Sequence, residues 1–600
     1  MTWRRQFSIP RNRRTMPESS GIQLGKQMNS SRGQSRLTLV ADFETTTLDE
    51  DCRVWAWGLC NIEAPEDVEI GLTLADFVNR VAQSNTTIYF HNLAFDGAFI
   101  LDFLLRRGFR HVSGHLRRKG QFSTLISSSS KFYSITVKWK NGNTTEFRDS
   151  LKKLPMSVAN ISKAFGLAEC KGDLDYRYPR PKGWIPTAAE RDYIRRDVTI
   201  VAQAVKVQLD EGMTRLTVGA DSLFEYKNIL GGRAFERLFP VLAGTMDAEI
   251  RRAYRGGFTY VNPKFKNQLV GPGRVYDVNS LYPSVMYDRM LPYGEPLYVD
   301  GLPTQTDEYP LFIVSITFTA KLKPGHIPCI QIKGSSQFVA VEYLSEIDEP
   351  TELVCSNVDL ELWQDHYDME ILSYNGGWKF RGLVGVFKDY IDKWSEVKAH
   401  SKGGLRVIAK LHLNSLYGKF ATNPDVTPNI PVMKNNVVHL VRGEDETRNP
   451  VYTAMGVFIT AYARDVTIRA AQQHYDTFIY ADTDSLHLID DTRYNLIPLR
   501  SRSPREIVAY DPPLIEVHPS KLGAWKLEYN FKRGIFVRAK CYTELTSKGY
   551  QTHIAGLPEK PAKTVTFADY VDKRKFSGKL LPRRVPGGIV LHDVMFTLNM

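Results

Sequence analysis

Two aspartates, Asp482 and Asp484, stand one residue apart at the end of the apolar run in FIYADTDSLHL. Charges of the same sign repel at this spacing, so the pair needs a stabilising context. A tight surface turn is one such context, because Asp side chains hydrogen-bond to turn backbone. A divalent cation is the other, since magnesium takes oxygen ligands and paired carboxylates become favourable when a cation lies between them. The segment by itself leaves both readings open.

A third aspartate extends the metal reading. Asp277 ends the predicted strand RVYDV, about two hundred residues before the pair. Two metal ions clamped between the three carboxylates would suit phosphoryl transfer, in which a protein mainly positions groups and neutralises charge. A predicted helix between them carries two cations, an amide and a phenol on one stripe: Arg406, Lys410, Asn414 and Tyr417.

The stripe has spacings of four, four and three residues, so its side chains share one helix face. It could grip a triphosphate and stack on a base or sugar, and Gly418 directly after it would let a base pair approach closely. The alternative is a solvated amphipathic helix. In both readings Ile408, Leu411 and Leu416 on the opposite side are expected to pack inward.

Four carboxylates in the N-terminal third form a second candidate group. Asp42 and Glu44 are two residues apart on the predicted strand LTLVADFETTT, so both point to one face. Asp96 follows the strand TTIYF, and Asp197 lies four residues after Tyr193 on a helix. Together they could cage two divalent ions that activate a water and stabilise the leaving oxygen of a phosphodiester, with Tyr193 orienting the water.

Single carboxylates of this set also have a simpler explanation, in which Asp197 and Tyr193 lie on a solvated helix face and Asp96 opens a turn with Gly97.

Strand and helix periods alternate up to about residue 215, which predicts an α/β or α+β domain. A second region follows, with the helix LRVIAKLHLNSLYGKF and the hairpin-like FIYADTDSLHL. A chain of 600 residues is too long for one hydrophobic core, so at least two domains are expected.

The net charge of +12 points towards polyanionic partners. Residues 1–36 carry more than half of it, with eight Lys or Arg and one Glu, which predicts a disordered basic arm. Such an arm would contact nucleic acid or an acidic partner, or it is a dispensable extension or the product of a start codon assigned too early. Six cysteines without a C-x-x-C pair argue against a disulfide scaffold or a structural zinc site and favour a reducing setting. No apolar run is long enough to span a bilayer, and no signal peptide is recognised.

In chain order after residue 37, the segments resemble the motifs of family B DNA polymerases. DFETTT, HNLAFDGAFI and YIRRDVTI resemble the three exonuclease motifs, and DVNSLYP, KLHLNSLYGKFA and YADTDS resemble polymerase motifs A, B and C. AKCY at 539–542 resembles the K-x-Y motif, and YRGGF at 254–258 the motif that links the two activities. DCRVWAWG, DSLKKLP, MGVFITAYAR and VPGGIVL are similar to segments of the protein-primed bacteriophage branch, the Phi-twenty-nine type.

The resemblance implies a role for each matching residue of the polymerase site. Asp277 and Asp484 would be the main metal ligands, with the Val278 carbonyl assisting and Asp482 as a third catalytic carboxylate. Tyr282 would lie under the incoming sugar and exclude a ribose hydroxyl. The other nucleotide-binding residues would be Lys398, Arg406, Lys410, Asn414, Tyr417 and Gly418. The DNA-binding residues on this side would be Tyr254, Gly256, Gly257, Phe258, Lys540 and Tyr542.

The resemblance also implies a 3′–5′ exonuclease site. Two metal ions would be bound by Asp42, Glu44, Asp96 and Asp197. Tyr193 and Lys171, the latter in CKGDLDY, would assist. The frayed single strand would be held, by sequence-tolerant stacking and backbone contacts, at His91, Asn92, Phe95, Ser150 and Leu151. Mg²⁺ would serve both sites, two ions in each, with Mn²⁺ as an alternative.

The implied architecture is α/β and α+β multidomain, with an RNase H-like exonuclease domain at 37–215 and a right-hand polymerase domain at 216–600. The palm would span about 216–288 and 451–554, the first insertion about 289–385, the fingers about 386–420, the second insertion about 421–450 and the thumb about 555–600. The first insertion would help to seat a priming protein and the duplex. The second would close a ring around DNA, which gives processive synthesis with strand displacement.

The resemblance thus implies a DNA polymerase that uses template, primer strand, dNTPs and a terminal protein, and that acts as a monomer in the cytoplasm of a virus's host, without a membrane partner. A family B polymerase with an ordinary nucleic acid primer and a non-catalytic DNA-binding replication scaffold are the alternatives. The chain departs from the family pattern in its basic arm, in Met156, where an aromatic residue is expected, and in His553, where a lysine is usual. A neutral imidazole would hold the primer phosphate less firmly.

Overall fold

The computed structural model describes residues 36–176, 178–332, 343–490 and 517–598. The predicted basic arm lies outside the described residues apart from Arg36, and the chain from Leu37 onward forms one unit. Among the described helices, none combines the length and the apolar character that crossing a bilayer requires.

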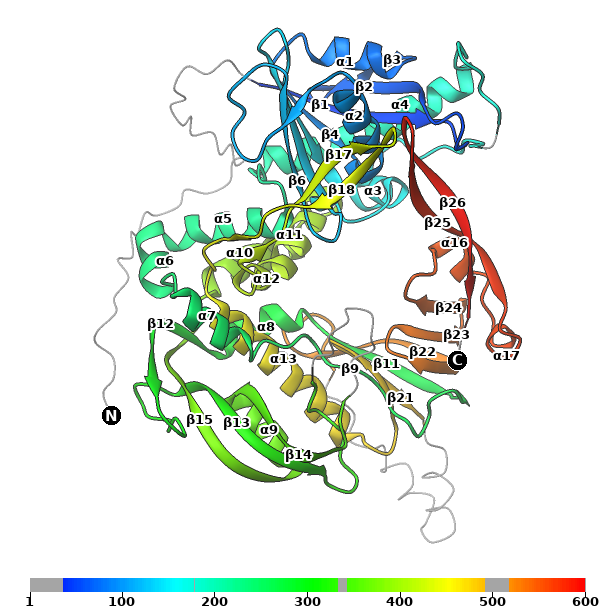
Figure 1. Ribbon diagram of the computed structural model, residues 1–600. Coiled ribbons are helices and arrows are strands. Elements are labelled where there is room, and N and C mark those ends of the chain that lie inside the picture. The colour runs from blue at the N-terminus through cyan, green and yellow to red at the C-terminus, as the bar shows by residue number, and fades with distance from the viewer. Residues whose placement is uncertain (1–35, 177, 333–342, 491–516, 599–600) are drawn as a thin grey trace, which may run out of the picture. The chain divides into compact units, whose positions relative to one another are not determined.

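The N-terminal region is built on an eight-stranded sheet with the order β3-β2-β1-β4-β8-β7-β6-β5 (Figure 1). The central strand β1 (Leu37–Thr45) pairs antiparallel with β2 (Val54–Asn61) and parallel with β4 (Thr86–Phe90). The remaining strands are β3 (Ala64–Gly71), β5 (Arg110–His111), β6 (Gln121–Ile126), β7 (Phe132–Lys138) and β8 (Thr144–Asp149).

Helices cover both faces of this sheet. Helix α4 (Ala188–Asp210) packs against β1, β2 and β3, while α1 (Leu74–Val81) and α2 (Leu93–Arg106) pack into the core on the other face. Side chains alternate along a strand, so Phe43 of β1 enters the core of α1 and α2 and Val40 enters the core of α4. Asp42 and Glu44 therefore share the α4 face, as their spacing predicts. The smaller helices here are η1 (Ser150–Lys152) and α3 (Val158–Phe165).

The C-terminal region is built on a second sheet, with the order β24-β23-β22-β11-β21-β20-β9 and with β10 beside β22. Its strands are β9 (Thr259–Val261), β10 (Leu269–Val270), β11 (Gly273–Val278), β20 (Phe478–Asp482), β21 (Ser485–Ile489), β22 (Trp525–Arg538), β23 (Cys541–Thr546) and β24 (Gly549–Ile554). The predicted strand RVYDV is the end of β11, and FIYADTDSLHL is the hairpin β20–β21.

A helical layer adjoins this sheet, and its long member α13 (Thr453–Gln473) is buried along most of its length. The others are α5 (Val218–Leu230), α6 (Gly232–Leu238), α7 (Gly244–Arg251), α8 (Leu281–Asp288), α10 (Lys388–His400), α11 (Gly403–Ser415) and α12 (Tyr417–Phe420). The single helix predicted for LRVIAKLHLNSLYGKF is thus two helices with Leu416 between them. Ile408 and Leu416 are fully buried and Leu411 is partly buried against the same core, which confirms the predicted inward face.

Three further units complete the described chain. A four-stranded sheet with the order β12-β15-β13-β14 carries helix α9 (Asn357–His366). Its strands are β12 (Met290–Val299), β13 (Leu311–Leu322), β14 (Glu346–Ser356) and β15 (Tyr367–Val384). Two small ladders follow, formed by β16 (Asp425–Val426), β17 (Asn429–Lys434), β18 (Val437–Arg442) and β19 (Glu446–Thr447). The last unit holds α16 (Glu559–Ala562), α17 (Ala568–Val571) and the hairpin of β25 (Lys575–Val585) and β26 (Gly588–Thr597).

Two candidate active sites

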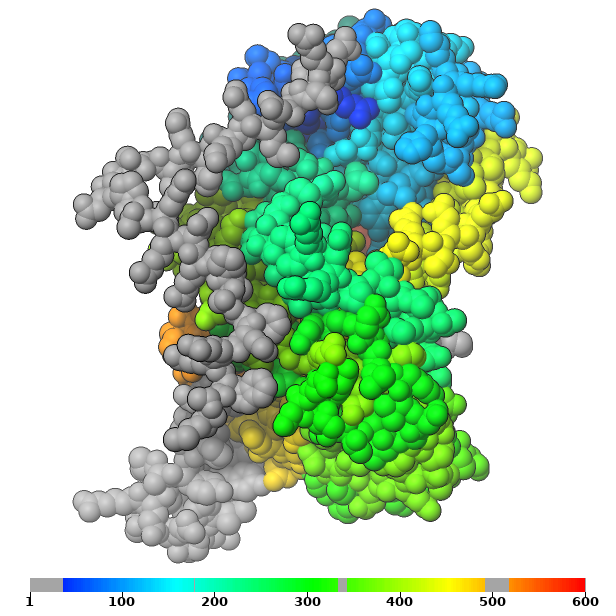
Figure 2. Space-filling view, turned by 90° about the vertical axis from the view of Figure 1, so that its left-hand side faces the viewer, coloured from blue at the N-terminus to red at the C-terminus, as the bar shows by residue number. Residues whose placement is uncertain are grey.

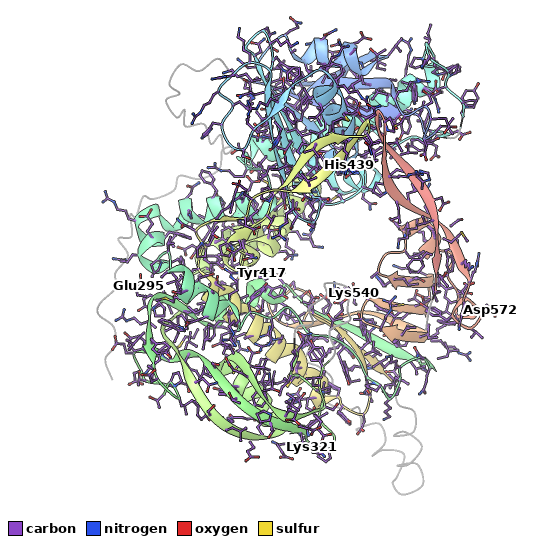
Figure 3. The ribbon with its side chains drawn as sticks, in the orientation of Figure 1. Glu295, Lys321, Tyr417, His439, Lys540 and Asp572 are labelled. Carbon is purple, nitrogen blue, oxygen red and sulfur yellow. The ribbon has the colours of Figure 1, made fainter. Side chains whose placement is uncertain are left out.

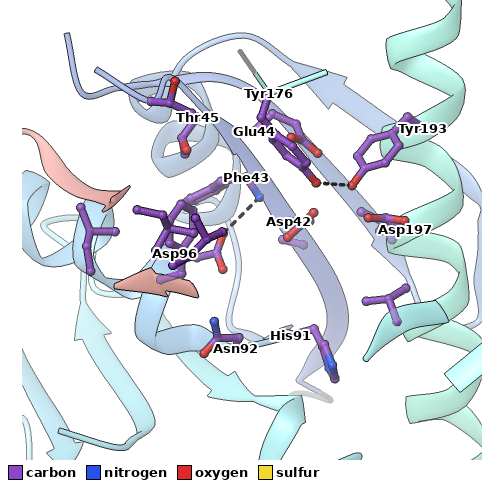
Figure 4. A pocket seen from close by; sticks show the side chains of 18 of the residues that line it. Asp42, Phe43, Glu44, Thr45, His91, Asn92, Asp96, Tyr176, Tyr193 and Asp197 are labelled. Carbon is purple, nitrogen blue, oxygen red and sulfur yellow. Dashed lines mark hydrogen bonds between the residues drawn. The ribbon is translucent and has the colours of Figure 1, made fainter. Parts of the chain in front are cut away.

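A pocket of about 770 Å³ opens along the carboxyl-terminal half of β1, and all four predicted carboxylates of the N-terminal region line it (Figure 4). Asp42 and Glu44 come from β1, Asp96 from the first turn of α2 and Asp197 from α4. Asp96 accepts a hydrogen bond from the Phe43 backbone N–H at 3.2 Å, which ties α2 to the strand.

The simpler readings of these residues are wrong. Asp197 and Tyr193 are both 4% exposed, so they do not lie on a solvated helix face. Asp96 is 1% exposed and lies inside a helix, so it does not open a turn with Gly97. Helix α4 presents its two residues reliably because it begins at a capping box, in which Thr187 and Glu190 exchange side-chain and backbone hydrogen bonds.

The crowding of buried carboxylates raises their pKa values. Burial and the charge of Asp197 raise the pKa of Asp42 to about 7. Burial and neighbouring charges raise the pKa values of Glu44 and Asp96 well above the usual range. One Asp197 oxygen, Oδ2, accepts a hydrogen bond from Lys171 Nζ at 2.5 Å, whereas Oδ1 is buried without a partner among the described residues.

These features fit a cation site. Carboxylate oxygens are the donors that hard divalent ions take, and a cation would remove the repulsion that raises the pKa values. As the side chains stand, no three His, Cys, Asp or Glu residues of the described chain form a group that could hold an ion. The ammonium group of Lys171 supplies the positive charge instead, and the carboxylates would have to move together onto a metal.

A second tyrosine belongs to this pocket although sequence reasoning did not single it out. The hydroxyls of Tyr176 and Tyr193 are 2.8 Å apart (Figure 4). Tyr176 lies in CKGDLDY, which is irregular in structure, so no periodicity relates it to the helix that carries Tyr193. Its place five residues after Lys171 in the sequence was the available signal.

The residues predicted to hold a single strand surround one edge of the pocket. His91, Asn92 and Phe95 line it. His91 hydrogen-bonds through Nε2 to the Met156 carbonyl at 2.8 Å and through Nδ1 to Ser150 Oγ at 3.0 Å. Burial lowers the pKa of His91, so the ring is neutral at pH 7.

Ser150 and Leu151 both hydrogen-bond to the residues that hold the edge of this pocket. Ser150 is completely buried and donates to the Phe90 carbonyl at 3.0 Å, so it can influence a bound strand only through His91. The Leu151 backbone N–H donates to Asp149 Oδ1, which also accepts from the Asn92 N–H at 3.1 Å. This shared acceptor holds Asn92 in its left-handed conformation, with φ of 81°.

Part of the pocket wall comes from the end of the chain. The hairpin β25–β26 contributes Leu580, Ile589, Val590, Leu591 and Asp593. Its tip is held by Asp102, whose carboxylate accepts the Gly587 N–H at 3.2 Å, and by Asp49, which contacts Arg583 and His592 at 2.8 Å each. The sequence contained no signal for this wall, because the hairpin lies almost 490 residues from Asp102.

The second candidate site lies where β11 meets the hairpin β20–β21. Asp277 is opposite Ser485 in the ladder, and the Val278 N–H donates to the Asp484 carbonyl at 2.8 Å. This pairing brings Asp277, Asp482 and Asp484 together across two hundred residues of sequence. Thr483, between the two hairpin aspartates, has φ of 65°, so the segment does form a tight turn, and this turn leaves the metal interpretation open.

A fourth carboxylate that sequence reasoning missed acts on this site. Burial, then the charges of Asp484 and Glu528, raise the pKa of Asp277 to about 7. Burial also raises the pKa of Asp484, and the charges of Asp482 and Glu528 add to it. Glu528 lies on β22 where the register with β11 shifts between Val275 and Tyr276, and such bulges re-aim side chains.

Lysine and arginine side chains offset part of the negative charge of these carboxylates. Lys540 Nζ contacts both oxygens of Asp482, at 2.9 and 3.0 Å. Four further cations lie beside the site: Lys398, Arg406, Lys410 and Lys526. Burial and the charges of the other three lower the pKa of Lys398, which shows that these cations crowd one place. Lys526, directly opposite Asp277 on β22, was not predicted.

The predicted nucleotide-binding stripe of α11 and α12 is exposed beside these cations. Arg406, Lys410 and Asn414 are exposed, and Arg406 donates to the Lys398 carbonyl. Tyr417, labelled in Figure 3, stacks on Tyr282 with ring centroids 4.0 Å apart. A Cβ atom on Gly418 would meet nothing within 4 Å, so its surface is open.

The YRGGF segment packs against the turn that lies between Asp482 and Asp484. A Cβ on Gly257 would lie 2.7 Å from the side chain of Thr483, and the Thr483 N–H donates to the Phe258 carbonyl at 2.6 Å. Arg464 of α13 donates to the carbonyl of Gly256 at 2.9 Å. The Phe258 side chain is completely buried, so any DNA contact from this residue would have to come from its backbone.

The predicted K-x-Y residues lie at the other side of the turn. Lys540 has φ of 56°, and its backbone N–H donates to the Tyr480 hydroxyl at 3.0 Å. Tyr542 is 8% exposed and stacks on His553 with centroids 4.9 Å apart. Burial lowers the pKa of His553, so this position carries no charge at neutral pH. Tyr254, like Tyr282 and Tyr417, is partly buried and packs against the core beneath the helical layer.

Comparison with known proteins agrees with this geometry. Residues 79–182 and 178–498 match the family described as DNA polymerase type B, organellar and viral. The DNA polymerase of Bacillus phage phi29 is 44% identical over 584 residues, covering 93% of this chain and 98% of that protein. The DNA polymerase of Streptococcus phage Cp-1 is 29% identical over 596 residues, covering 93% and 98%.

Solved structures agree as well. Phi29 DNA polymerase complexed with primer-template DNA matches with a TM-score of 0.87 and 42% identity, over 94% of this chain and all of that one. The same polymerase complexed with single-stranded DNA matches with a TM-score of 0.85. These matches confirm the multidomain α/β fold, and membership of the family implies the use of divalent metal that is general for such enzymes. The chain therefore belongs to the type B DNA polymerases of organelles and viruses and is a DNA polymerase of the Phi29 type.

Proposed function

We propose that this polymerase starts synthesis on the hydroxyl of a terminal protein, elongates processively with strand displacement, and proofreads with a 3′–5′ exonuclease. The observation that carries the proposal is the presence of two separate carboxylate groups in two different sheets. In each group burial raises carboxyl pKa values, and in each a lysine contacts one aspartate: Lys171 with Asp197 and Lys540 with Asp482.

The proposed subdomains follow whole elements. The eight-stranded sheet with α1 to α4 would be the exonuclease domain, the second sheet with α8 and α13 the palm, and α10 and α11 the fingers. The sheet β12–β15 and the ladders β16–β19 would be the two insertions expected at about 289–385 and 421–450. The hairpin β25–β26 with α16 and α17 would be the thumb. The cytoplasm of a phage-infected host is the proposed setting, and a monomer the proposed state.

In nucleotide transfer, Asp277 and Asp484 would hold two divalent ions, with the Val278 carbonyl assisting. When bound, the ions activate the attacking hydroxyl and neutralise the triphosphate. The cations of α10, α11 and β22 would bind the triphosphate oxygens, and the stacked pair Tyr282 and Tyr417 would support the incoming sugar and base. Lys540 would hold Asp482 in place beside the primer terminus, where Tyr542 and the YRGGF backbone fix the surrounding structure.

In strand hydrolysis, the four carboxylates around β1 would hold two divalent ions, which when bound activate a water and stabilise the leaving oxygen. Tyr193 would orient that water, and its hydrogen bond with Tyr176 fixes the direction of its hydroxyl. Lys171 would stabilise charge beside Asp197. Neutral His91, with Asn92 and Phe95, would hold the strand end by contacts that do not depend on sequence.

Separating the two activities tests the division into two sites. Asp484→Ala should abolish extension of a primed template with dNTPs and Mg²⁺ while single-strand degradation continues, and Asp42→Ala should do the reverse. EDTA should stop both activities, and added Mg²⁺ should restore them. Loss of both activities in either folded variant would contradict the proposal.

Protein priming needs its own experiment. A small basic protein encoded next to this chain should become covalently labelled when it is incubated with the polymerase, labelled dATP and Mg²⁺, and Asp484→Ala should prevent the labelling. Initiation at genome ends from an oligonucleotide, without any labelled protein, would favour the alternative of an ordinary nucleic acid primer.

A further inference from the structure

A cluster of cations lies at the outer edge of the N-terminal sheet, outside both candidate sites. Residues 103–145 contain nine Lys or Arg and no Asp or Glu, a charge density far above that of the chain as a whole. The six that gather around β5, β6 and β7, here named the edge cluster, are Arg110, Arg117, Arg118, Lys119, Lys138 and Lys140. Their segment belongs to the light-blue surface in the upper right of Figure 2.

The strand register aligns part of this cluster in one row. Arg110 of β5 pairs with Gln121 of β6, and Gln121 pairs with Lys138 of β7. Residues directly opposite each other on neighbouring strands point to the same face, and each strand lies about 5 Å from the next. Arg110 and Lys138 therefore flank the side chain of Gln121 on one face of the sheet.

Gln121 in turn fixes the loop that carries the other cations. Its Oε1 accepts hydrogen bonds from the backbone N–H groups of Arg117, at 3.0 Å, and Arg118, at 2.7 Å. The loop is thereby held over the face that Arg110 and Lys138 occupy.

The turn after β7 brings in the last two cations. A Cβ on Gly142 would lie 3.4 Å from Cε of Lys119, so the Lys119 side chain runs towards this turn. Lys140 lies in the same turn, which is closed by the hydrogen bond from the Trp139 N–H to the Asn143 carbonyl at 2.8 Å. All six cations therefore share one end of the sheet.

The edge cluster has no ion-pair partner among the residues that the structure describes. Five of its six residues are exposed and Lys138 is half-buried. Within the described ranges none of the six takes part in an ion pair, whereas several basic residues elsewhere in this domain do, as Arg195 does with Glu169 at 3.0 Å. Gathering unpaired cations in this way raises the local positive potential, and a polyanion relieves their mutual repulsion.

We propose that the edge cluster is a second DNA-binding surface, which contacts the phosphodiester backbone of DNA outside the two active sites. Lys and Arg reach phosphate oxygens regardless of base sequence, so this surface binds any sequence and adds to the residence time of the enzyme on long DNA. Because the strand register and Gln121 hold the backbone of these residues in place beforehand, little loop entropy is lost on binding.

Salt dependence of binding tests the proposal directly. The full chain with Arg117→Ala, Arg118→Ala and Lys119→Ala is compared with the unchanged protein on a long duplex and a long single strand, by fluorescence anisotropy over a salt series. Each lost phosphate contact lowers the slope of log K against log salt by about 0.9 on duplex and about 0.7 on single strands. The expected fall is therefore about 2 to 3 on the DNA form that the cluster contacts, with affinity at least about tenfold weaker at physiological salt.

A matched variant separates the cluster from net charge. Lys182→Ala, Arg233→Ala and Arg237→Ala also remove three exposed cations, and none of these forms an ion pair within the described ranges. This variant should keep the slope of the unchanged protein. Both variants should extend a short primed template at the normal rate, since their residues lie outside the active sites.

Two outcomes overturn the proposal. One is an unchanged slope for the edge-cluster variant on both DNA forms, which would leave an acidic protein as the partner of this surface. The other is an equal loss in the matched variant, which would mean that total charge alone matters. Thermal melting of both variants verifies that any loss arises in the folded protein.

Discussion

At the scale of single residues, both candidate sites place carboxylates where they repel one another. Asp42 and Asp277 belong to different sheets, yet burial and a neighbouring aspartate raise the pKa of each to about 7. Such a raised pKa means that the folded protein resists ionisation of the group. In each site, repulsion between ionised carboxylates therefore lowers the stability of the metal-free protein, and a divalent cation would remove this repulsion. The effect can be measured as a change in the free energy of unfolding.

This repulsion predicts that the stability of the metal-free protein depends on pH. The pKa of Asp42 is about 7 in the folded state against 3.8 when unperturbed, so between these values the folded protein holds a proton that the unfolded chain has released. Its contribution to the free energy of unfolding in EDTA therefore falls as pH rises from about 4 to about 7. Asp42→Asn should stabilise the metal-free protein at pH 8 by on the order of 1–3 kcal/mol, and by less at pH 5.

Denaturant unfolding in EDTA at pH 5 and pH 8 measures this difference. Asp67→Asn, which removes an exposed carboxylate of β3, is the control and should have little effect at either pH. A gain for Asp42→Asn that is no larger at pH 8 than at pH 5 would show that Asp42 is not held at a raised pKa.

The two tyrosines of the first pocket give a second prediction at this scale. Tyr176→Phe removes one partner of the 2.8 Å hydroxyl contact and leaves Tyr193 in place. A neutral hydrogen bond contributes about 1 kcal/mol, so single-strand degradation should slow about fivefold. Tyr193→Phe should cost more, and polymerisation should be unaffected in both. If the Tyr176→Phe variant degraded single strands at the normal rate, the orientation of Tyr193 would not depend on its hydrogen bond with Tyr176.

At the scale of elements, helix α13 is the support of the polymerase turn. Thr467 Oγ1 donates to the Thr483 carbonyl at 2.7 Å, between the two hairpin aspartates. Arg464, one turn earlier, holds the YRGGF carbonyls and pairs with Asp359 of α9 at 2.7 Å. The helix thus fixes the turn, the YRGGF segment and the β12–β15 unit relative to one another.

Thr467→Val tests this support with a change that keeps the side-chain shape. The Thr483 carbonyl loses a buried donor, at a cost of about 1–3 kcal/mol, so the rate of nucleotide addition should fall about tenfold. Thr460→Val on the same helix is the matched control, because Thr460 is equally buried but bonds only to carbonyls of its own helix. Primer extension in single-turnover conditions compares the two, and equal rates would remove Thr467 from the list of positioning residues.

At the scale of the whole molecule, residues from the two ends of the chain build one pocket. The hairpin β25–β26 supplies an apolar wall opposite the carboxylates of β1, and Ile589 is part of the core of the N-terminal sheet. A Cβ on Gly588 would lie 2.5 Å from Phe99, so only glycine lets the hairpin tip approach this closely. The site for strand hydrolysis is therefore complete only when the last residues of the chain have folded onto the first domain.

Asp49→Asn weakens this docking without touching a pocket carboxylate. It removes the ion pair with Arg583 and weakens the contact with His592, and exposed pairs of this kind contribute about 0.2–1 kcal/mol. Single-strand degradation should slow about two- to fivefold, with normal extension of a primed template. Asp51→Asn, in the same loop but paired with Arg53, is the control. Degradation as slow in the control would assign the effect to the loop rather than to the hairpin.

Much of the candidate site was predictable from local sequence pattern. Spacing of two on a strand placed Asp42 and Glu44 on one face, and spacing of four on a helix placed Tyr193 and Asp197 together, because these periods are set by backbone geometry alone. The same rules identified the exposed stripe of α11. No local period relates Asp277 to Asp484. Their assignment to one metal site came from the resemblance to a family.

Tertiary structure alone decided the rest. Glu528 and Lys526 reach the polymerase site through a shift in strand register, and register depends on pairing between segments far apart in sequence. Tyr176 lies in an irregular segment, and the hairpin wall comes from the opposite end of the chain. The sequence by itself determined which groups could do the chemistry, whereas long-range packing decided which of them share a site and at what charge, since contacts between distant segments leave no periodic trace in either one.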